Sequence, residues 1–556
     1  MSFNTPVVME ETPLLSVDDN NDNDNNNSSN SCCSSSSQQK KGFIIGAMMI
    51  LVLIVFGIGI ISNNHRRNKT SLDLESSWNS LEFPKGFLWG AATSSYQIEG
   101  AVNEDGRGLS IWDTYCDQPN AISDHSSGAV ACDHYHRFKD DVRMMKDLNI
   151  QAYRFSIAWP RIFPNGTGEL NQKGIDFYNE LIDELVKNNI EPVITLYHWD
   201  LPQALEDRYG GWLGREIVDD FANYARTCFR AFGDRVKYWI TLNESWTVAV
   251  QGYNDGSKAP AKLDNPSINV YQAAHNLVLA HARAATIYKQ EFVNDNDDAT
   301  DSNRQGWIGI ANCGDFRYPK DPNKVEDVEA AERAMIFQYA WLSDPFFFGD
   351  YPKEMRELLG DRLPKFTNKE REELMNGSTD FLGLNHYSTL YAANVDNDSS
   401  IGGYWGDMRV RFSTDPSWKK NFMGWSTNPD GCRELLLWIS DRYDGATIII
   451  TENGTSEDEP NLATSLRDEG RREYFEGYLR ACREAIDKGV NLVGYFAWSL
   501  MDNFEWEYGY TKRFGICHVD YETQKRTPKR SALWYSEAIE SNGANIVARK
   551  EPTNRT

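Results

Sequence analysis

Short apolar runs alternate with longer amphipathic or polar segments from about residue 80 to residue 546. The eight runs, each about the length of a strand, are Phe87–Ser95, Gln151–Trp159, Pro192–Tyr197, Val236–Asn243, Trp307–Ala311, Phe381–Tyr387, Ala446–Glu452 and Leu492–Ser499. Segments with the apolar spacing of a helix lie between them, among them Gly174–Asn188, Ile217–Phe232, Tyr271–Gln290 and Arg471–Lys488. Repetition of strand and helix predicts a parallel sheet. Eight such units predict an α/β fold, the (β/α)8 TIM barrel, with its functional site at the carboxyl ends of the strands.

The N-terminal residues do not follow this pattern. Residues 1–41 are rich in Asn, Asp and Ser and poor in apolar side chains, so we interpret them as a disordered tail. Gly42–Ile61 is a run of twenty residues without a charge, the length that a helix needs to cross a bilayer core. It starts too far from Met1 to be an ordinary cleaved signal peptide. The sequence therefore predicts a transmembrane signal-anchor helix at 42–61, a linker at 62–79, the barrel domain at 80–546 and a C-terminal tail at 547–556.

Positive charges flank both ends of the predicted span, so the positive-inside rule does not fix its orientation. The segment Glu10–Leu15 resembles the acidic dileucine signals that cytosolic sorting adaptors bind on proteins destined for endosomes, lysosomes or vacuoles. The chain has Asn-X-Ser/Thr glycosylation acceptors at Asn68, Asn165, Asn376, Asn397 and Asn554, which would suit a main body in a lumenal space. Other acceptors occur at Asn26, Asn27 and Asn453. These signals favour a single-pass membrane protein with a cytosolic N-terminus and a lumenal or extracellular barrel.

The charge balance narrows the range of partners. The chain has 556 residues and a formal net charge of −24 at pH 7. We therefore expect no nucleic-acid partner, because a phosphate-binding surface needs clustered Lys and Arg. The nine cysteines show no regular metal-binding spacing, and Cys116 and Cys132 are close enough in sequence for a disulfide in an oxidising compartment, which the sequence leaves open. It leaves the oligomeric state open too.

Polar and aromatic side chains gather where the predicted strands end. They are Gln97, Arg154, His198, Trp199, Asn243, Glu244, Asn385, His386, Tyr387, Glu452 and Trp498, with Glu505 and Trp506 in the following loop. Such groups bind sugars, because hydroxyls take hydrogen bonds from the polar groups while C–H faces pack on indole rings. The carboxylates Glu244 and Glu452 also meet the minimum requirement for cleaving a glycosidic bond, a protonated acid and an ionised partner. The pattern therefore predicts a sugar-cleaving pocket.

Seven motifs, in one order along residues 80 to 540, resemble the successive signatures of glycoside hydrolase family 1, the β-glucosidase family. They are FLWGAATSSYQIEGA, YRFSIAWPRIFPNG, YHWDLPQAL, TLNE, LNHYS, ITENG and AWSLMDNFEWEYGY. One of them alone would be modest evidence, whereas the ordered set leaves little room for coincidence. The resemblance implies a β-glycosidase that cleaves terminal, non-reducing β-D-glucosyl residues, with β-galactosyl or β-fucosyl residues as side substrates.

The resemblance also implies roles for individual residues. Glu452 would be the nucleophile, held ionised by Arg154 and a hydrogen bond from Tyr387. Glu244 would be the acid/base, and Asn243 would bond the sugar 2-hydroxyl. Substrate contacts are implied for Gln97, His198, Trp199, Tyr387, Trp498, Glu505 and Trp506, and an orienting role for Asn385. Because the family retains anomeric configuration, we predict carboxyl groups about 5 Å apart. The family pattern includes no metal or other cofactor.

Some of these residues have a purely structural alternative. Glu244 and Glu452 could be salt-bridge partners at the barrel rim, and His198 and Trp498 could be core residues. His134 and His136 have the spacing of a metal pair, but their segment also matches the family pattern, so we interpret them as structural. For the aglycone, Trp246, Trp405, Trp418 and Trp425 are candidate stacking residues or loop anchors.

Residues at two positions narrow the substrate. Glu505 would repel the phosphate of a 6-phosphorylated sugar, and Glu244 stands where thioglucoside-cleaving relatives tend to carry glutamine. An O-linked β-glucoside is therefore the expected substrate. Two alternatives use the same fold: a transglycosylase that passes the sugar to an alcohol, and a catalytically weak, membrane-tethered relative that binds glycans. The sequence does not identify the group that is cleaved off.

Overall fold

The computed structural model describes residues 81–293, 306–375, 377–396 and 402–546. The predicted N-terminal tail, transmembrane helix, linker, Glu10–Leu15 signal and C-terminal tail lie outside the described residues. Six of the glycosylation acceptors also lie outside them: Asn26, Asn27, Asn68, Asn376, Asn397 and Asn554. Within the described ranges, no helix is both long enough and apolar enough to cross a membrane.

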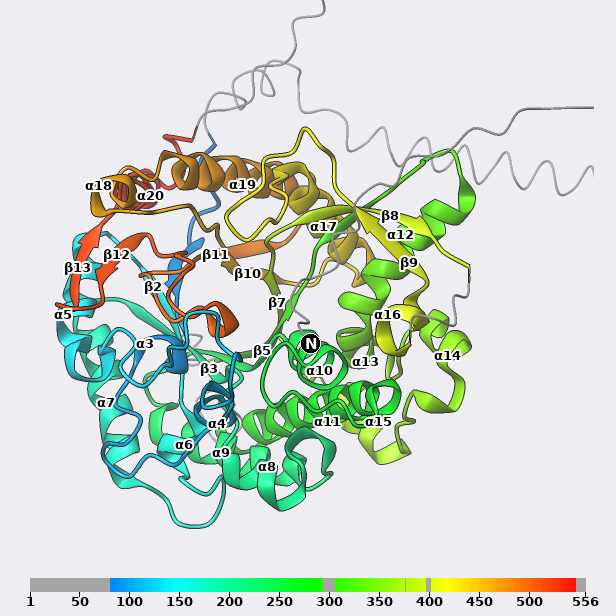
Figure 1. The fold of residues 1–556 in the computed structure, drawn as a ribbon, viewed down its shortest axis with the longest axis horizontal. Coiled ribbons are helices and arrows are strands. Elements are labelled where there is room, and N and C mark those ends of the chain that lie inside the picture. Colours follow the sequence, from blue (N-terminus) through cyan, green and yellow to red (C-terminus); the bar gives the residue numbers. More distant parts are fainter. Residues whose placement is uncertain (1–80, 294–305, 376, 397–401, 547–556) are drawn as a thin grey trace, which may run out of the picture. The chain divides into compact units, whose positions relative to one another are not determined.

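Eight parallel strands close into a barrel (Figure 1), which confirms the predicted fold. They are β1 (Leu88–Ala92), β2 (Ala152–Ser156), β3 (Glu191–Tyr197), β4 (Tyr238–Asn243), β5 (Trp307–Cys313), β7 (Phe381–Asn385), β10 (Ile448–Asn453) and β11 (Leu492–Trp498). Each lies within or overlaps one of the eight apolar runs. The order around the barrel is β1-β11-β10-β7-β5-β4-β3-β2, so each strand pairs with its neighbours in sequence and β1 pairs with β11 to close the ring.

The strands are apolar on both faces because both faces are covered. Side chains that point into the barrel form one buried cluster, which includes Val193, Ile240, Ile449 and Phe496. Side chains that point outward join a larger cluster with the surrounding helices. Gly90 on β1 is required by the inner packing, since a Cβ there would lie 2.3 Å from the ring of Phe496.

The longer helices are α5 (His134–Asp147), α7 (Gln172–Lys187), α9 (Ile217–Phe232), α11 (Pro266–Ile287), α12 (Val325–Gln338), α17 (Pro429–Arg442), α19 (Glu469–Asp487) and α20 (Arg530–Glu540). The four predicted helices correspond to α7, α9, α11 and α19. The largest difference is at α11, which begins five residues earlier than predicted, with Pro266 in its first turn. Proline is favoured there because its missing N–H has no helical partner at that position.

Shorter helices join these elements. They are α3 (Ser95–Ile98), α4 (Ile111–Cys116), α6 (Trp159–Ile162), α8 (Gln203–Tyr209), α10 (Ser245–Val250), α13 (Asp344–Phe348), α14 (Lys353–Leu359), α15 (Asn368–Met375), α16 (Gly403–Met408) and α18 (Leu462–Ser465). The π-helical turns η3 (Gln251–Asp255) and η4 (Tyr288–Val293) and the 3-10 turn η7 (Trp506–Tyr508) lie in the connections. Of these, α3 and η7 carry residues of the predicted site, and α10 begins directly after Glu244.

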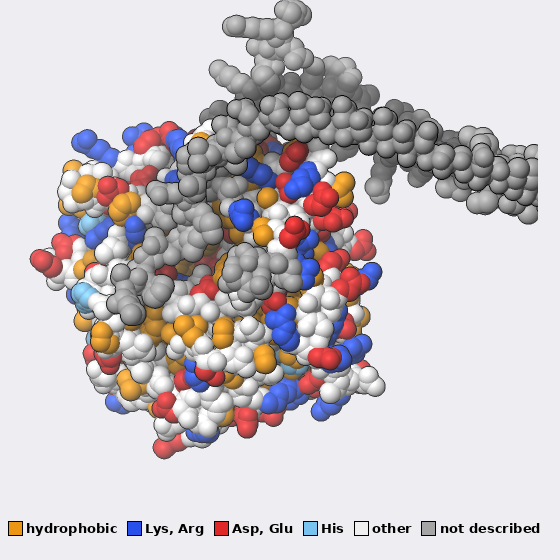
Figure 2. Space-filling model, turned by 45° about the vertical axis from the view of Figure 1, so that its right-hand side comes forward, with side chains coloured by type: hydrophobic (Ala, Val, Ile, Leu, Met, Phe, Trp, Pro, Cys, Tyr) orange, Lys and Arg blue, Asp and Glu red, His pale blue; other side chains and the backbone are white. Residues whose placement is uncertain are grey.

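Two small sheets outside the barrel are not predicted by the alternation of runs. One contains β6 (Phe316–Pro319), β8 (Thr389–Asn394) and β9 (Val410–Ser413), and the other contains β12 (Cys517–Asp520) and β13 (Lys525–Pro528). Both follow the carboxyl ends of barrel strands. On the face shown in Figure 2, Lys and Arg side chains are interspersed with Asp and Glu.

Candidate active site

Two glutamates occupy the carboxyl ends of barrel strands that are not neighbours. Glu244 directly follows β4 and precedes α10, in a left-handed conformation with φ 50°. Glu452 is the fifth residue of β10. Strands β5 and β7 lie between β4 and β10 in the barrel order. Both side chains are buried, and because all strands are parallel, both lie at the same end of the barrel.

Glu452 is bound by a cation. Its Oε1 accepts a hydrogen bond from Arg154 Nη1 at 2.5 Å, and its Oε2 accepts one from the Tyr387 hydroxyl at 2.7 Å. Arg154 is fully buried and also donates to the Thr451 carbonyl at 3.0 Å. Burial raises the pKa of Glu452, and the Arg154 guanidinium and the Tyr387 hydroxyl oppose that rise because they stabilise the ionised form.

Glu244 is bound by neutral groups instead. Thr247 Oγ1 donates to its Oε2 at 2.6 Å, and Asn385 Nδ2 donates to its Oε1 at 2.8 Å. Among the described residues, no Lys or Arg forms an ion pair with it. Burial, followed by the negative charge of Glu452, raises the pKa of Glu244 to about 7. The two carboxyl groups therefore differ in their partners, which is the asymmetry that an acid and a nucleophile require.

Asn243 and Asn385 connect the two glutamates. Asn243 Oδ1 accepts from Arg154 Nη2 at 2.6 Å and from Asn385 Nδ2 at 3.0 Å. The same Nδ2 of Asn385 reaches Glu244, so a continuous set of hydrogen bonds runs from Glu452 through Arg154 to Glu244. Such a network fixes the rotamers of its members. The carboxyl separation of about 5 Å stays a prediction.

Aromatic rings and amides extend the same site. The ring of His198, whose Nε2 lies 3.1 Å from Asn243 Nδ2, is nearly parallel to the rings of Trp498 (17°) and Trp506 (13°). Trp199 packs against Trp506 with ring centroids 4.4 Å apart. Burial lowers the pKa of His198 well below its usual value, so the imidazole is neutral and offers hydrogen bonds without charge.

Gln97 and Glu505 complete the set of predicted residues. Gln97 Nε2 donates to the Phe504 carbonyl at 2.9 Å and lies 3.4 Å from Glu505 Oε2. Burial raises the pKa of Glu505 to about 8, with the charges of Glu452 and Glu244 adding to the effect. The residues predicted from the strand ends thus lie in one contiguous group at this end of the barrel, except His386, whose ring bonds the Gly314 carbonyl and packs on Tyr478 instead. Trp498 also packs in the barrel interior, so it is both a core residue and a member of this group.

The structure separates the four candidate stacking tryptophans. Trp246 is buried and donates to the Tyr404 hydroxyl, and Trp405 donates to Asp255. Trp418 stacks on Tyr391 of β8. Trp425 packs against a residue of the site: it is 36% exposed, and its ring lies 5.5 Å from that of Tyr387. The other three are interpreted as anchors of loops.

The structure also describes three other features considered from the sequence: a histidine metal pair, a disulfide and a glycosylation acceptor. His134 Nδ1 lies 2.8 Å from Asp141, whereas His136 faces Asp133 and Glu104, so the two rings do not converge. Cys116 and Cys132 are both free thiols, so the disulfide left open by the sequence is not formed. Asn453 is fully buried and donates to the His386 carbonyl, which makes it inaccessible as a glycosylation acceptor in the folded chain.

One cluster among the described residues has the arrangement of metal ligands, formed by Glu459, Asp502 and His518. The Lys529 ammonium already bridges it, at 2.8 Å from both Glu459 Oε2 and Asp502 Oδ1. Arg471 adds a second cation at 2.7 Å from Glu459. Because the carboxylates are neutralised by protein cations, we interpret this cluster as structural.

Several supporting residues escaped the sequence reasoning. Thr247 lies one helical turn after Glu244, so its spacing was a usable signal for the hydrogen bond that it makes. Thr451 precedes Glu452 and donates to Asn385 Oδ1 at 2.6 Å. Alternation along a strand would have assigned Thr451 to the face opposite Glu452, which hid this contact.

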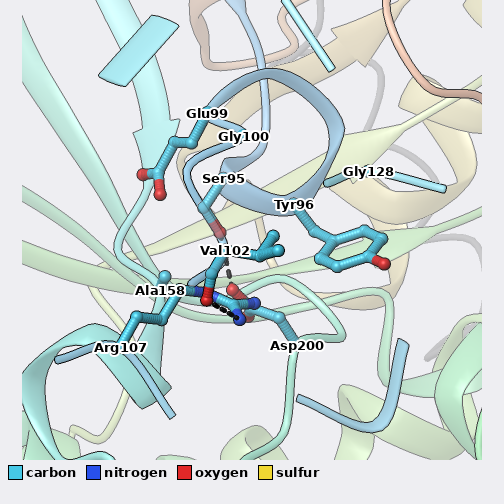
Figure 3. A pocket seen from close by; sticks show the side chains of 9 residues that line it. All are labelled: Ser95, Tyr96, Glu99, Gly100, Val102, Arg107, Gly128, Ala158 and Asp200. Carbon is cyan, nitrogen blue, oxygen red and sulfur yellow. Dashed lines mark hydrogen bonds between the residues drawn. The ribbon is translucent and has the colours of Figure 1, made fainter. Parts of the chain in front are cut away.

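Asp200 is a further supporting residue. Its Oδ2 accepts from Ser95 Oγ at 2.6 Å, and its Oδ1 has no hydrogen-bond partner. Figure 3 shows Ser95 and Asp200 pointing toward one another, near Arg107. They line a small cavity of about 10 Å³. The space is about that of one water molecule. Asp200 thereby fixes the start of α3, the helix that carries Gln97.

Comparisons with known proteins agree on one family. The model of glycosyl hydrolase family 1 matches residues 79–544. "Beta-glucosidase 34" of Oryza sativa subsp. japonica is 46% identical over 483 residues, which cover 83% of this chain and 92% of that protein. A rice β-glucosidase mutant solved in a covalent complex with Glc is 45% identical, with a TM-score of 0.78 over 82% of this chain and 98% of its own. A β-glucosidase of the fungus Humicola insolens, solved with glucose, is 43% identical, with a TM-score of 0.79 over 83% and 99% of the two chains.

Proposed function

The chain belongs to glycosyl hydrolase family 1 and is a retaining β-glucosidase, and we propose that Glu452 is its nucleophile and Glu244 its acid/base. One observation carries this assignment. Glu452 accepts hydrogen bonds from the Arg154 cation and the Tyr387 hydroxyl, whereas Glu244 accepts them from Thr247 and Asn385, which are neutral. The transglycosylase and glycan-binding alternatives have no comparable support.

In the first step, an ionised oxygen of Glu452 attacks C1 of the glucosyl residue. The bond between C1 and the glycosidic oxygen breaks, and its electron pair goes to that oxygen. Glu244 transfers its proton to the same oxygen, so that the leaving group departs as a neutral alcohol. A pKa of about 7 keeps a large fraction of Glu244 protonated in neutral solution for this purpose. A glycosyl ester of Glu452 results.

In the second step, Glu244 acts as a base. Formation of the ester removes the negative charge of Glu452, which is one of the two causes that raise the pKa of Glu244. The pKa of Glu244 then falls, and its ionised form takes a proton from a water molecule. The water oxygen attacks C1 from the face that the leaving group occupied, and Glu452 is released. Two inversions at C1 give net retention.

The surrounding residues suit an unmodified glucosyl group. Asn243 is held by Arg154 and Asn385, so its Nδ2 is oriented toward the site and available to the 2-hydroxyl. With a pKa of about 8, Glu505 is mostly protonated at neutral pH and offers both a donor and an acceptor to sugar hydroxyls. The expected repulsion of a phosphate by Glu505 therefore applies to its ionised form, at higher pH. The parallel rings of His198, Trp498 and Trp506 provide apolar surface for the C–H face of the ring.

The hydrogen bond from Tyr387 provides a first test. We expect Tyr387→Phe to lower kcat for an aryl β-glucoside by roughly 10- to 100-fold, because a hydrogen bond to a charged group contributes about 1.5–3 kcal/mol. Tyr391→Phe is the matched control, since its hydroxyl bonds Asp415 outside the site. Steady-state kinetics of both variants would decide. A Tyr387→Phe enzyme within twofold of wild type would argue against an orienting role for this hydroxyl.

We also propose that Gly42–Ile61 anchors the enzyme in a membrane, with residues 1–41 in the cytosol and the barrel in a lumenal or extracellular space. The support is the uncharged length of this run and the Glu10–Leu15 segment, which resembles a sorting signal read in the cytosol. That signal favours delivery to a vacuole, lysosome or endosome. The exposed acceptor Asn165 suits a lumenal barrel.

Protease protection tests this topology. With an epitope tag at the N-terminus, sealed vesicles prepared with their cytosolic face outward should lose the tag to added protease and keep the barrel intact. Sodium carbonate extraction should leave the protein in the membrane pellet, and deletion of residues 42–61 should release it. A protected tag with a digested barrel would reverse the orientation, and complete extraction of the intact chain by carbonate would contradict the anchor.

A further inference from the structure

An ion pair of Lys258 and Glu507 lies beside the proposed active site and has no role in the two chemical steps. The Lys258 side chain is 12% exposed and that of Glu507 is 24% exposed, so both are mostly enclosed but still reach solvent. Lys258 follows η3, in the loop after Glu244, and Glu507 lies in η7, next to Trp506. Two loops far apart in the sequence thus meet at this pair.

The surrounding backbone fixes the pair in place. The carbonyl of Glu507 accepts hydrogen bonds from both the N–H and the hydroxyl of Ser123, each at 2.8 Å. The carbonyl of Ser257, next to Lys258, accepts one from the Tyr115 hydroxyl at 3.3 Å. A third segment of the chain, residues 115–123, therefore hydrogen-bonds the backbone of both loops and fixes the positions from which the two charged side chains extend.

Lys258 lies beside the aromatic side chains of the site and within electrostatic reach of the proposed acid/base. Its ammonium lies 5.4 Å from the ring centroid of Trp199, which packs on Trp506. It opposes the rise in pKa that burial imposes on Glu244 and on Glu505, which places its charge within electrostatic reach of both carboxyl groups. Since Glu244 protonates the glycosidic oxygen, the group attached to that oxygen must extend from its vicinity.

A different part of the same site is aromatic. Trp425 is exposed next to Tyr387, which contacts Glu452, and its ring lies 6.0 Å from that of Phe514. The site thus has a charged, hydrogen-bonding part near Glu244 and an apolar part near Glu452. An aglycone that is apolar throughout would exclude water from the ion pair and offer no hydrogen bonds in its place, so its binding would cost desolvation free energy. A pyranose ring, by contrast, has apolar C–H faces and a rim of hydroxyl groups.

From this arrangement we propose that Lys258 and Glu507 hydrogen-bond the hydroxyl groups of a sugar leaving group, which makes a β-linked di- or oligosaccharide the preferred substrate. The ammonium donates to hydroxyl oxygens and the carboxylate accepts from hydroxyl groups, so the pair binds a polyol with both of its charges satisfied. The proposal rests on the proposed function, because it assigns the aglycone side of that same site. Lys258 and Glu507 determine specificity and take no part in bond cleavage.

The test compares cellobiose, whose leaving group is glucose, with 4-nitrophenyl β-glucoside, whose leaving group has no hydroxyl rim. Lys258→Met should lower kcat/KM for cellobiose by about tenfold or more and change kcat/KM for the aryl glucoside by less than about threefold. Glu507→Gln should show the same selectivity. The double variant should lose less than the product of the two single losses, because the residues act as a pair.

Controls separate this outcome from a general structural effect. Lys262→Met removes another ion pair of the same loop, with Glu206, and should leave both activities unchanged. Lys258→Arg should retain most of the preference for cellobiose. Equal losses on both substrates would overturn the proposal, as would undiminished hydrolysis of cellobiose by Lys258→Met and Glu507→Gln. If the wild type hydrolyses the aryl glucoside but neither variant loses activity selectively on cellobiose, this inference alone is refuted. If the wild type hydrolyses neither substrate, the proposed function is refuted.

Discussion

Replacing Glu452 with alanine should abolish hydrolysis of both aryl β-glucosides and disaccharides, with kcat reduced by roughly 10⁴-fold or more. The variant lacks the oxygen that attacks C1, and no other carboxylate touches Arg154, since Glu452 is its only ion-pair partner among the described residues. Arg154 would then be a buried cation without a counterion. Glu452→Gln keeps the volume of the side chain and removes its charge, so a similar loss there would assign the effect to the charge.

Azide should restore part of the activity of Glu452→Ala. The small anion fits the space that the carboxylate leaves, next to Arg154 and Tyr387, and attacks C1 from the side opposite the leaving group. A substrate with a good leaving group, such as 2,4-dinitrophenyl β-glucoside, should then give α-glucosyl azide, identified by NMR. Formation of the β-azide would place the attacking group on the Glu244 side and contradict the assignment. Normal hydrolysis by Glu452→Ala would exclude Glu452 as the nucleophile.

The barrel could be predicted from the sequence because its strands are covered on both faces. A strand such as β10 is buried along its whole length, so it appears as a continuous apolar run rather than as an alternating pattern. The site was predictable for a related reason. Asn243 and Glu452 are polar residues at the ends of such runs, where the barrel geometry requires the carboxyl ends to converge, and Arg154 is a charged residue within one of them.

Other features depend on contacts between loops, which have no periodic signal. The small sheet of β6, β8 and β9 joins segments from two separate connections, β5 to β7 and β7 to β10, and no local pattern indicates that pairing. Sequence reasoning could not distinguish Trp425 from Trp418, because both are loop tryptophans and only the folded chain places one beside Tyr387. Lys258 and Glu507 are 249 positions apart in the sequence, so no local pattern indicates their ion pair either.

The second large effect concerns Glu244. We expect Glu244→Ala to lower kcat/KM for cellobiose by roughly 10³-fold or more, because the glucose oxygen must be protonated as it leaves. The loss should be much smaller for 2,4-dinitrophenyl β-glucoside, whose leaving group departs as a stable anion. For that substrate the glycosyl ester should accumulate, since no base activates water, and a burst of phenol should precede slow turnover. Azide should speed this turnover and give β-glucosyl azide, the opposite anomer from that of Glu452→Ala.

The pH dependence provides an independent measurement of the same role. In wild type, kcat/KM for cellobiose should fall as the pH rises through about 7, because Glu244 acts in its protonated form and its pKa is about 7. Glu244→Gln, which keeps the size and shape of the side chain but cannot titrate, should lose this basic limb when assayed with the dinitrophenyl substrate. A basic limb that persists unchanged in both Glu244 variants would assign it to another group, and Glu505, with a pKa of about 8, is then the residue to replace. Equal losses on the two leaving groups would contradict general acid catalysis by Glu244, because only the poor leaving group needs its proton.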